Sequence, residues 1–254
     1  MLKQERQQLI LNEVSQNGSV STNKLAQKFN VTKDTIRKDF QELAKKGLVE
    51  RIHGGVSKIE NEIVNFDIRV GRNQRIKRIL AKEALKIIQN KSIVFLDSGT
   101  TNLELAKLLP NNYSGTIITN SPHIALEVSK DEKIKIYLIG GEVNSTSKIV
   151  SGASAIREIE AINIELCILG VSSLSVDYGI TYPSFEESLL KQQLIKQSNR
   201  VISIIEKEKI NTVATFYCSE ISAINDMITD ELDDHIINQL EDEGIHVIKV
   251  NIEE

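Results

Sequence analysis

The sequence predicts an α/β protein with two domains: a small N-terminal domain of three helices and a hairpin, and a larger domain built on a mainly parallel sheet. Three observations support this prediction. Capped helical periodicity and a Gly-Gly turn occupy residues 1–57. From residue 74 onward, short apolar runs alternate with helical stretches, as in a parallel sheet covered by helices on both faces. Basic charge is concentrated in the first domain.

The composition is that of an ordinary globular protein, with 41% hydrophobic and 26% charged residues in a chain of 254. No run approaches the roughly 18 apolar residues of a membrane helix. Residues 1–6 lead into a charged segment and not into an apolar signal core, so we expect a cytoplasmic protein with no membrane partner. Two cysteines, Cys167 and Cys218, are too few for a disulfide framework or a zinc site. We expect no metal and no cofactor.

The charge distribution separates the two domains. The formal net charge is −4, yet residues 1–57 hold 10 Lys/Arg against 6 Asp/Glu, and the remainder holds 21 against 29. A basic domain attached to an acidic one is typical of a DNA-binding head on a body that the phosphate backbone repels.

Apolar spacing predicts three helices in the first domain, over residues 3–16, 22–29 and 33–46. Ser21 and Thr32 are favourable N-caps for the second and third helices. Two short helices joined by a tight turn, the second with polar residues at its start, form the helix-turn-helix pattern.

The third helix has the side chains of a recognition helix. In a major groove, Arg reads guanine with two hydrogen bonds, while Lys and Thr reach phosphates or base edges. A solvated charged helix face would have a similar sequence, but the hairpin that follows favours the DNA-binding interpretation. The residues expected on the outward side are Thr32, Lys33, Thr35, Arg37 and Lys38.

A hairpin is predicted directly after the third helix. Alternating apolar residues flank Gly54-Gly55, and two glycines accept the positive φ that a tight turn requires. A hairpin in this place is a wing, so Arg51, His53 and Lys58 are expected to touch the DNA backbone or minor groove. His53 has the alternative of a purely structural role. We therefore predict a winged helix-turn-helix domain over residues 1–57.

Residues 58–73 show little periodicity and are interpreted as a linker, and residues 74–254 as the α/β domain that senses an effector and forms oligomers. The expected strands are 92–96, 116–119, 135–139, 166–169, 201–205, 224–228 and 246–250. The expected helices are 74–89, 101–109, 121–129, 156–161, 185–198 and 233–243.

Polar or glycine-bearing loops follow three consecutive strands of this domain, where ligands of such sheets bind. The first is Asp97-Ser98-Gly99-Thr100-Thr101, whose backbone N–H groups and hydroxyls at a helix N-terminus suit an anion. An ordinary Ser/Thr helix cap is the alternative for this loop alone. Thr119-Asn120-Ser121 and Gly140-Gly141-Glu142 end the next two strands. Together the three loops predict a site for a phosphorylated sugar.

The chain resembles the DeoR-type (deoxyribose-operon repressor) regulators of sugar metabolism over nearly its whole length. In the head, the resemblance is carried by Thr35-Ile36-Arg37-Lys38-Asp39-Phe40, Leu43, Gly47 and Arg51-Ile52-His53-Gly54-Gly55. In the body it is carried by Arg69, Lys77, residues 97–101, Thr119-Asn120, Gly140-Gly141, Gly152, Gly170, Gly179-Ile180-Thr181, Glu186, Lys191 and Thr229-Asp230.

The resemblance implies a sensor domain similar in fold to ribose-phosphate isomerases. It implies that Thr35, Arg37 and Lys38 contact operator DNA and that the turn at His53-Gly54-Gly55 is the wing. The effector residues that it implies are Asp97, Ser98, Gly99, Thr100 and Thr101 around the phosphate, with Thr119, Asn120, Gly141, Glu186, Lys191 and Lys209. The chain departs from the family pattern at Glu206-Lys207-Glu208-Lys209, where many members have Asp-x-Ser-Lys, and at Val171-Ser172-Ser173, where many have a further glycine.

We therefore expect a homo-oligomeric DNA-binding regulator, a repressor of a carbohydrate-metabolism operon that a phosphorylated sugar releases from double-stranded operator DNA. A sugar-phosphate isomerase or deaminase with an attached head is the alternative from another class. The Asp-Gly-His cluster of the related deaminases is replaced here by Val171-Ser172-Ser173, which argues against catalysis. A DNA-binding architectural protein without an effector is a third interpretation. Activation in place of repression stays open, because the same head serves either.

Overall fold

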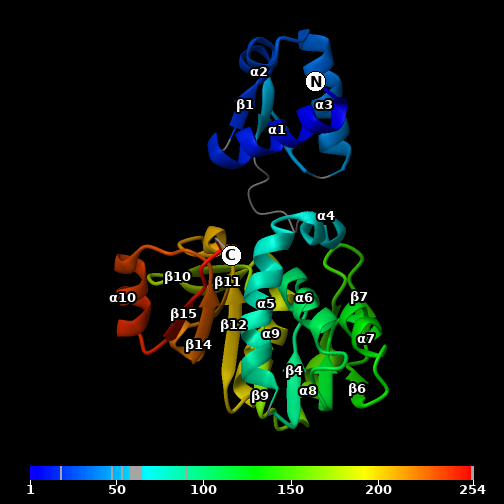
Figure 1. Cartoon of the computed structure of the whole chain (residues 1–254), viewed down its shortest axis with the longest axis vertical. Helices are drawn as coiled ribbons and strands as arrows, with labels where there is room; N and C mark the ends of the chain where they lie inside the picture. Colours follow the sequence, from blue (N-terminus) through cyan, green and yellow to red (C-terminus); the bar gives the residue numbers. More distant parts are fainter. Residues whose placement is uncertain (18, 47, 53, 58–64, 90, 253–254) are drawn as a thin grey trace. The chain divides into compact units, whose positions relative to one another are not determined.

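The computed structural model describes residues 1–17, 19–46, 48–52, 54–57, 65–89 and 91–252. The chain divides into two compact units, Met1–Ile68 and Arg69–Glu254 (Figure 1). No helix in the described part of the chain is both long and apolar enough to cross a bilayer.

The small unit is a three-helix domain with a three-stranded antiparallel sheet of order β1-β3-β2. Its elements are α1 (Lys3–Asn17), β1 (Ser19–Ser21), α2 (Thr22–Phe29), α3 (Lys33–Lys45), β2 (Glu50–Ile52) and β3 (Gly55–Ser57). The two predicted N-caps are confirmed: Ser21 Oγ accepts the N–H of Lys24 and Thr32 Oγ1 accepts that of Thr35, each at 3.2 Å. The hairpin strands β2 and β3 were predicted, but the strand β1 that pairs with β3 was not.

Side chains from all three helices form the core of the small unit, among them Ile10, Leu25, Ile36 and Phe40. A buried polar contact ties α1 to α3 beside this core. Asp39 on α3 is 1% exposed, and it accepts Nε of Arg6 at 2.5 Å and Nε2 of Gln7 at 3.2 Å. The hydrogen bond to Asp39, together with the aspartate charge, raises the pKa of Arg6.

The large unit is built on a seven-stranded sheet of order β15-β14-β12-β9-β4-β5-β6, in which every adjacent pair is parallel. This confirms the predicted mainly parallel α/β domain. Its strands are β4 (Ile93–Leu96), β5 (Gly115–Thr119), β6 (Ile134–Leu138), β9 (Leu166–Leu169), β12 (Val201–Ile205), β14 (Asp226–Thr229) and β15 (His246–Lys249).

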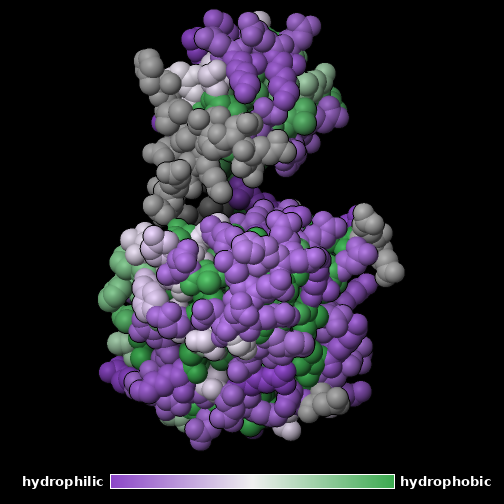
Figure 2. All heavy atoms as spheres, turned by 90° about the vertical axis from the view of Figure 1, so that its left-hand side faces the viewer, coloured by the Kyte–Doolittle hydropathy of each residue, from purple (hydrophilic) through white to green (hydrophobic). Residues whose placement is uncertain are grey.

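Helices cover both faces of this sheet. They are α5 (Gln74–Ile88), α6 (Thr100–Leu108), α7 (Pro122–Val128), α8 (Ala153–Glu160), α9 (Phe185–Gln197) and α10 (Asp234–Asp242). The helices α5, α6 and α7 pack along one another, and α8 packs against α9. All four residues of the central strand β9 are buried, as expected for a strand with helices on each side. Figure 2 shows hydrophilic side chains over most of the face that it presents, with apolar patches between them.

Short antiparallel strands outside the main sheet were not predicted. A second sheet, of order β10-β11-β13, consists of β10 (Ser173–Ser175), β11 (Gly179–Tyr182) and β13 (Phe216–Ser219). A ribbon pairs β7 (Glu142–Val143) with β8 (Val150–Ser151). These segments are two to four residues long, too short to show a period of their own.

The predicted linker, residues 58–73, contains regular structure that sequence reasoning missed. Residues 58–64 lie outside the described part of the chain, and helix α4 covers Phe66–Gly71. Nζ of Lys77, on α5, donates to the carbonyl oxygens of Arg69 and Arg72, both at 2.6 Å. A lysine that caps the last carbonyls stabilises a helix end. This contact depends on the tertiary fold, and a six-residue helix shows no periodicity of its own.

Candidate functional site

The first turns of α3 present the predicted DNA-reading side chains to solvent. Lys33, Arg37 and Lys38 are exposed, whereas Ile36, on the opposite side, is fully buried. Next to these side chains, the hydroxyl groups of Thr32 and Thr35 form a hydrogen bond of 2.9 Å with each other. The guanidinium of Arg37 lies 2.9 Å from Asp34, an exposed pair that contributes little stability and is open to exchange for a phosphate or a base.

The hairpin pairs with β1 and presents two of its described residues to solvent. Arg51 and Gly54 are exposed, and Gly54 has a φ of +79°, as predicted for the turn. Gly55 is buried, and a Cβ there would overlap the carbonyl oxygen of Val20, so only glycine fits. His53, Gly47 and Lys58, singled out in the sequence, lie outside the described residues.

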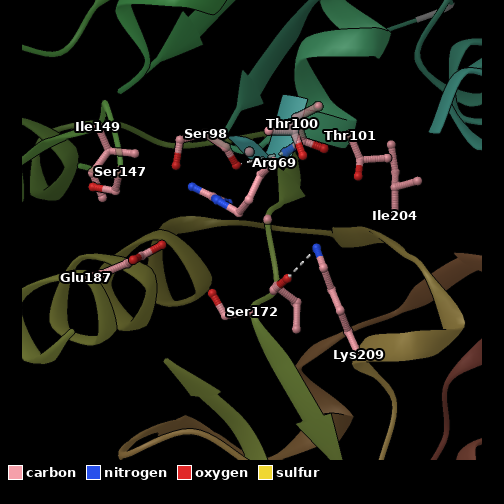
Figure 3. A pocket seen from close by; sticks show the side chains of 14 residues that line it. Arg69, Ser98, Thr100, Thr101, Ser147, Ile149, Ser172, Glu187, Ile204 and Lys209 are labelled. Carbon is pink, nitrogen blue, oxygen red and sulfur yellow. Dashed lines mark hydrogen bonds between the residues drawn. The ribbon is translucent and has the colours of Figure 1, made fainter. Parts of the chain in front are cut away.

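The candidate effector pocket lies where the strand order of the large sheet reverses. From β4 the chain runs outward through β5 to β6, and it returns to β9 on the other side of β4. At such a switch point the loops after the two central strands diverge, and a ligand fits between them. The pocket found there is lined by Arg69, Ser98, Gly99, Thr100, Thr101, Asn102, Ser147, Ile149, Gly170, Val171, Ser172, Glu187, Ile204 and Lys209 (Figure 3).

Helix α6 begins at this pocket without a side-chain cap. Its N-cap is Gly99, with a φ of +133°, and no side chain accepts from the first turn. The loop before it is held from behind: Asn120 Oδ1 accepts the N–H of Ser98 at 3.0 Å, and Asn102 Nδ2 donates to the carbonyl of Asp97 at 2.8 Å. The N–H groups and positive dipole end of α6 are thereby available to an anion.

Two cationic side chains line the same pocket. Burial lowers the pKa of Arg69 and of Lys209, while the charge of Glu187 opposes this at Arg69 and that of Glu206 opposes it at Lys209. Nζ of Lys209 donates to the carbonyl of Val171 at 3.3 Å, and 27% of its side chain is exposed. The desolvation that lowers these pKa values also strengthens the attraction of both cations for an anion.

Glu206, the acid that replaces the common aspartate of the family pattern, is buried behind these cations. It accepts Nδ2 of Asn73 at 2.9 Å and the hydroxyl of Thr101 at 3.4 Å. Its Oε1 lies 3.9 Å from Nζ of Lys209 and 4.0 Å from Nζ of Lys77. The longer acid therefore orients the cations and one hydroxyl of the pocket.

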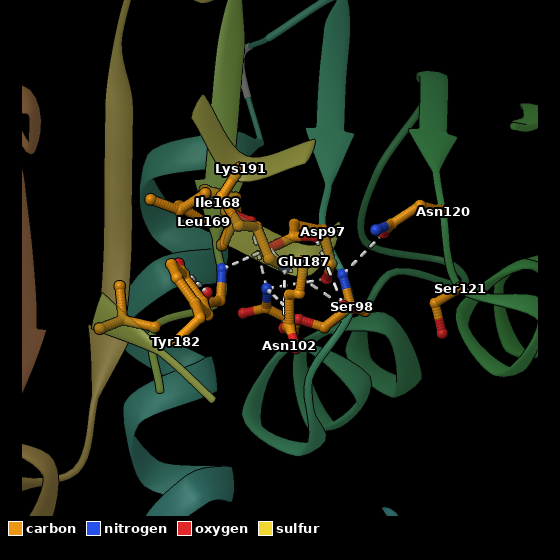
Figure 4. A network of polar contacts seen from close by, with 12 residues as sticks. Asp97, Ser98, Asn102, Asn120, Ser121, Ile168, Leu169, Tyr182, Glu187 and Lys191 are labelled. Atoms are coloured by element: carbon orange, nitrogen blue, oxygen red, sulfur yellow. Dashed lines mark hydrogen bonds and ion pairs between the residues drawn. The ribbon is translucent and has the colours of Figure 1, made fainter. Parts of the chain in front are cut away.

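Beneath the loop lies a buried ion pair (Figure 4). Nζ of Lys191 contacts Oδ2 of Asp97, which also accepts the N–H of Gly170 at 2.7 Å. A Cβ at residue 170 would overlap the carbonyl oxygen of Ser98, so a glycine is required where the end of β9 packs against the start of the loop after β4. Burial by itself would lower the pKa of Lys191, but the charges of Asp97 and Glu187 outweigh it and raise the pKa. Lys191 therefore stays charged.

The predicted effector residues fall into two groups. Ser98, Gly99, Thr100, Thr101 and Lys209 line the pocket together. The others do not line it: Asp97, Lys191, Thr119 and Asn120 are buried behind it, Gly141 lies in an exposed loop, and Glu186 is exposed, with one carboxylate oxygen 3.5 Å from Ser151 Oγ.

Sequence reasoning did not assign several lining residues to the site. They are Arg69, Asn102, Ser147, Ile149, Gly170, Val171, Ser172, Glu187 and Ile204. Arg69 and Gly170 belong to the family pattern, which was the available signal for them. No comparable signal marked Glu187 over its neighbour Glu186.

Comparisons with known proteins agree with this architecture. Residues 6–62 match the DeoR-like helix-turn-helix domain, and residues 72–231 match the DeoR C terminal sensor domain. The HTH-type transcriptional regulator GolR of Listeria innocua is 29% identical over 96% of this chain and 97% of its own. The HTH-type transcriptional regulator GlpR of Haloferax volcanii is 30% identical over 98% of each.

Two further proteins are similar to this chain, one over most of its length and one over about half of it. The glycerol-3-phosphate regulon repressor of Escherichia coli K12 is 30% identical over 91% of this chain and 92% of its own. A solved D-ribose-5-phosphate isomerase shares 17% identity over 54% of each chain, at a TM-score of 0.40. With both of its domains matched in order, the chain belongs to the DeoR family of helix-turn-helix transcriptional regulators.

Proposed function

We propose that the protein represses genes of carbohydrate metabolism: the small domain binds operator DNA, and a phosphorylated sugar bound in the large domain releases it. The names of two relatives support this direction. One is the glycerol-3-phosphate regulon repressor, and the other is the HTH-type transcriptional repressor GlcR of Bacillus subtilis.

The exposed first turns of α3 support the DNA-binding half of the proposal. Arg37 reads a base edge, and Lys33 and Lys38 neutralise phosphates, with Thr32 and Thr35 between them. Arg51 and the turn at Gly54 act as the wing. Because cations displace condensed counterions from DNA, binding weakens steeply as salt rises.

The observation that carries the effector half is the uncapped N-terminus of α6 opening into a pocket with two cations. The phosphate lies against the N–H groups of Thr100 and Thr101, with Arg69 and Lys209 as its charge partners. Asp97, Asn120 and Lys191 act indirectly, by holding the loop in place.

Regulation requires a difference in affinity between two states of the protein. An effector that binds better to the state with mismatched heads shifts the population off DNA. A coupling of about 1–3 kcal/mol corresponds to roughly 5- to 150-fold regulation. A homo-oligomer presents paired heads to half-sites spaced by about one helical turn of DNA or a multiple of it.

The pocket contacts favour binding over catalysis. No histidine belongs to the lining residues within the described part of the chain, and Glu187 is the one carboxylate among them. The buried acids Asp97 and Glu206 are engaged by lysine and amide donors. Proton transfer at a sugar carbon needs a base with a proton shuttle in reach. Glu187 is the one candidate base among the described lining residues, and no histidine lies beside it there to act as the shuttle.

The test is fluorescence anisotropy of the full chain with DNA from upstream of its own gene, over a range of salt and with a panel of phosphorylated sugars. Tight, salt-sensitive binding that one phosphosugar abolishes supports both halves. Sequence-specific binding that no compound alters contradicts the effector half. Turnover of a phosphosugar by the purified protein contradicts the non-catalytic role.

A further inference from the structure

We propose that Glu187 sets the chemical class of the effector: a phosphate monoester whose far end carries hydroxyl or amino groups, in preference to one with a carboxylate or a second phosphate there. This inference rests on the proposed binding of a phosphorylated effector. It adds to that proposal a residue that determines specificity and the kind of ligand that this residue selects.

Glu187 reaches the pocket because of its position in the first turn of α9. Ser184 Oγ caps this helix by accepting the N–H of Glu187 at 3.3 Å. Successive helical residues point about 100° apart, so Glu187 faces the pocket with 12% of its side chain exposed, while Glu186 lies at the surface. In Figure 3 Glu187 lies on the same side of the view as Ser147, and Lys209 and Thr101 lie on the opposite side.

The two ends of the pocket differ in charge. Around Glu187, the buried or half-buried charged groups are Asp97, Glu187 and Lys191, which sum to a formal charge of −1. Arg69 interacts with both Glu187 and Glu206 and is the proposed partner of the phosphate, so it is counted at neither end. Nζ of Lys191 lies 3.7 Å from Oε1 of Glu187 and also contacts Asp97, so it serves two carboxylates. At the other end, Lys77, Lys209 and Glu206 sum to +1, and the N-terminus of α6 adds its positive dipole end.

This asymmetry determines which ligand group each end accepts. The α6 end accepts a phosphate. The Glu187 end already carries a net negative charge, so a second anion there would remain uncompensated in a largely desolvated place, which is costly. A carboxylate accepts hydrogen bonds and donates none. It therefore pairs with hydroxyl or ammonium donors, while the hydroxyls of Ser98, Ser147 and Ser172 donate or accept as needed.

The experiment uses ligand pairs that differ only by CH₂OH against COO⁻: glycerol 3-phosphate with 3-phosphoglycerate, and glucitol 6-phosphate with 6-phosphogluconate. Their affinities for the full-length protein are measured by titration calorimetry, with inorganic phosphate as a probe of the α6 end. In the better-fitting pair we expect the alcohol to bind about 10-fold more tightly or better, a difference of about 1.4 kcal/mol. Glu187→Gln removes the negative charge, so the ratio of the alcohol affinity to the carboxylate affinity falls to about 3-fold or less. Glu186→Gln leaves this ratio unchanged.

The outcomes separate this inference from the proposed function. Equal affinities within both pairs, alongside binding of inorganic phosphate, overturn the inference and leave the phosphate site standing. A ratio that Glu187→Gln does not change also overturns it. If no phosphate compound binds, the effector half of the proposed function falls and the inference falls with it. Because equal affinities in the wild type already overturn the inference, it remains falsifiable even if the variant has a folding defect.

Discussion

Asp97 and Lys191 form an ion pair in which neither side chain exposes more than 1% of its surface, directly beneath the loop that opens α6. The carboxylate also holds the N–H of Gly170, so a single acid links the ends of β4 and β9. Removal of one partner leaves the other charge buried, at a cost of about 3–5 kcal/mol.

We expect Asp97→Asn to lower the free energy of unfolding of the large domain by about 3 kcal/mol or more. The double variant Asp97→Asn/Lys191→Met regains part of this loss, because it removes the unpaired ammonium. Urea unfolding measures both. Lys130→Met, which breaks an exposed pair with Glu127, is the control and costs less than about 1 kcal/mol. An Asp97→Asn variant as stable as the wild type would contradict the role assigned to the pair.

We expect Arg37→Ala to weaken operator binding by about 1–3 kcal/mol and to relax the preference at one base position. Its guanidinium is paired with Asp34 at the surface of the small domain, so the fold loses little when it is removed. Competition anisotropy against a set of single-base operator variants measures the effect. Lys86→Ala, which removes an exposed cation from the large domain, is the control and leaves DNA affinity unchanged. If Arg37→Ala kept the affinity and the base preference of the wild type, α3 would not be the recognition helix.

Thr100→Val is expected to keep the DNA affinity and to blunt the response to the effector by about 10-fold. The side chain is 5% exposed at the first position of α6, and the loss of a hydrogen bond to a charged group costs about 1.5–3 kcal/mol. The measurement is the effector concentration that half-releases DNA. Thr116→Val, at the start of β5 and so at the opposite end of the sheet, serves as the control. An unchanged half-release concentration would exclude the hydroxyl from the site.

The elements that sequence reasoning predicted well are those with local signals. Ser21 and Thr32 cap helices through bonds to residues three positions away, and the Gly54 turn needs only its own backbone. Apolar runs four or five residues long located the parallel strands, because burial on both faces leaves little polar surface. The strand-end loop at Ser98–Thr101 was found by the same local logic, since its chemistry lies in consecutive residues.

What sequence reasoning missed depends on tertiary contacts. Arg69 precedes the domain predicted over 74–254, and it reaches the pocket because Lys77 caps the end of its helix. Sequence reasoning named Glu186 as an effector residue, whereas the neighbouring Glu187 lines the pocket. A shift of one position in a helix turns the side chain by about 100°. No pattern of one sequence distinguishes the two acids. Their difference comes from the rotation at which α9 packs.

The stability of the large domain is expected to depend on Lys77 at alkaline pH. Burial lowers the pKa of this lysine from 10.5 to about 8. Between these values the unfolded chain binds a proton that the folded chain does not, so the Lys77 contribution to the free energy of unfolding increases as pH rises. From pH 8 to 10, wild type gains about 2 kcal/mol relative to Lys77→Met.

Urea unfolding of both proteins at several pH values checks this difference. The comparison with the variant is needed because Cys218 and Tyr113, whose pKa values burial raises to about 12, contribute with the opposite sign above pH 9. These contributions cancel between the two proteins. For Lys86→Met, on the exposed side of the same helix, the difference in free energy of unfolding from wild type should be the same at every pH. A constant offset for Lys77→Met as well would mean that its pKa is not lowered.

Gly55→Ala is expected to abolish DNA binding and to leave effector binding intact. The new Cβ would overlap the carbonyl oxygen of Val20, so β3 and β1 separate and the wing loses its support. Gly71→Ala is the matched control, because nothing lies within 4 Å of a Cβ there and the residue has no positive φ. Both variants are tested by fluorescence anisotropy with operator DNA and by titration calorimetry with the phosphorylated alcohol that binds the wild type more tightly. Loss of both activities in Gly55→Ala would show that the two compact units do not fold independently, and retention of DNA binding would show that the wing is dispensable.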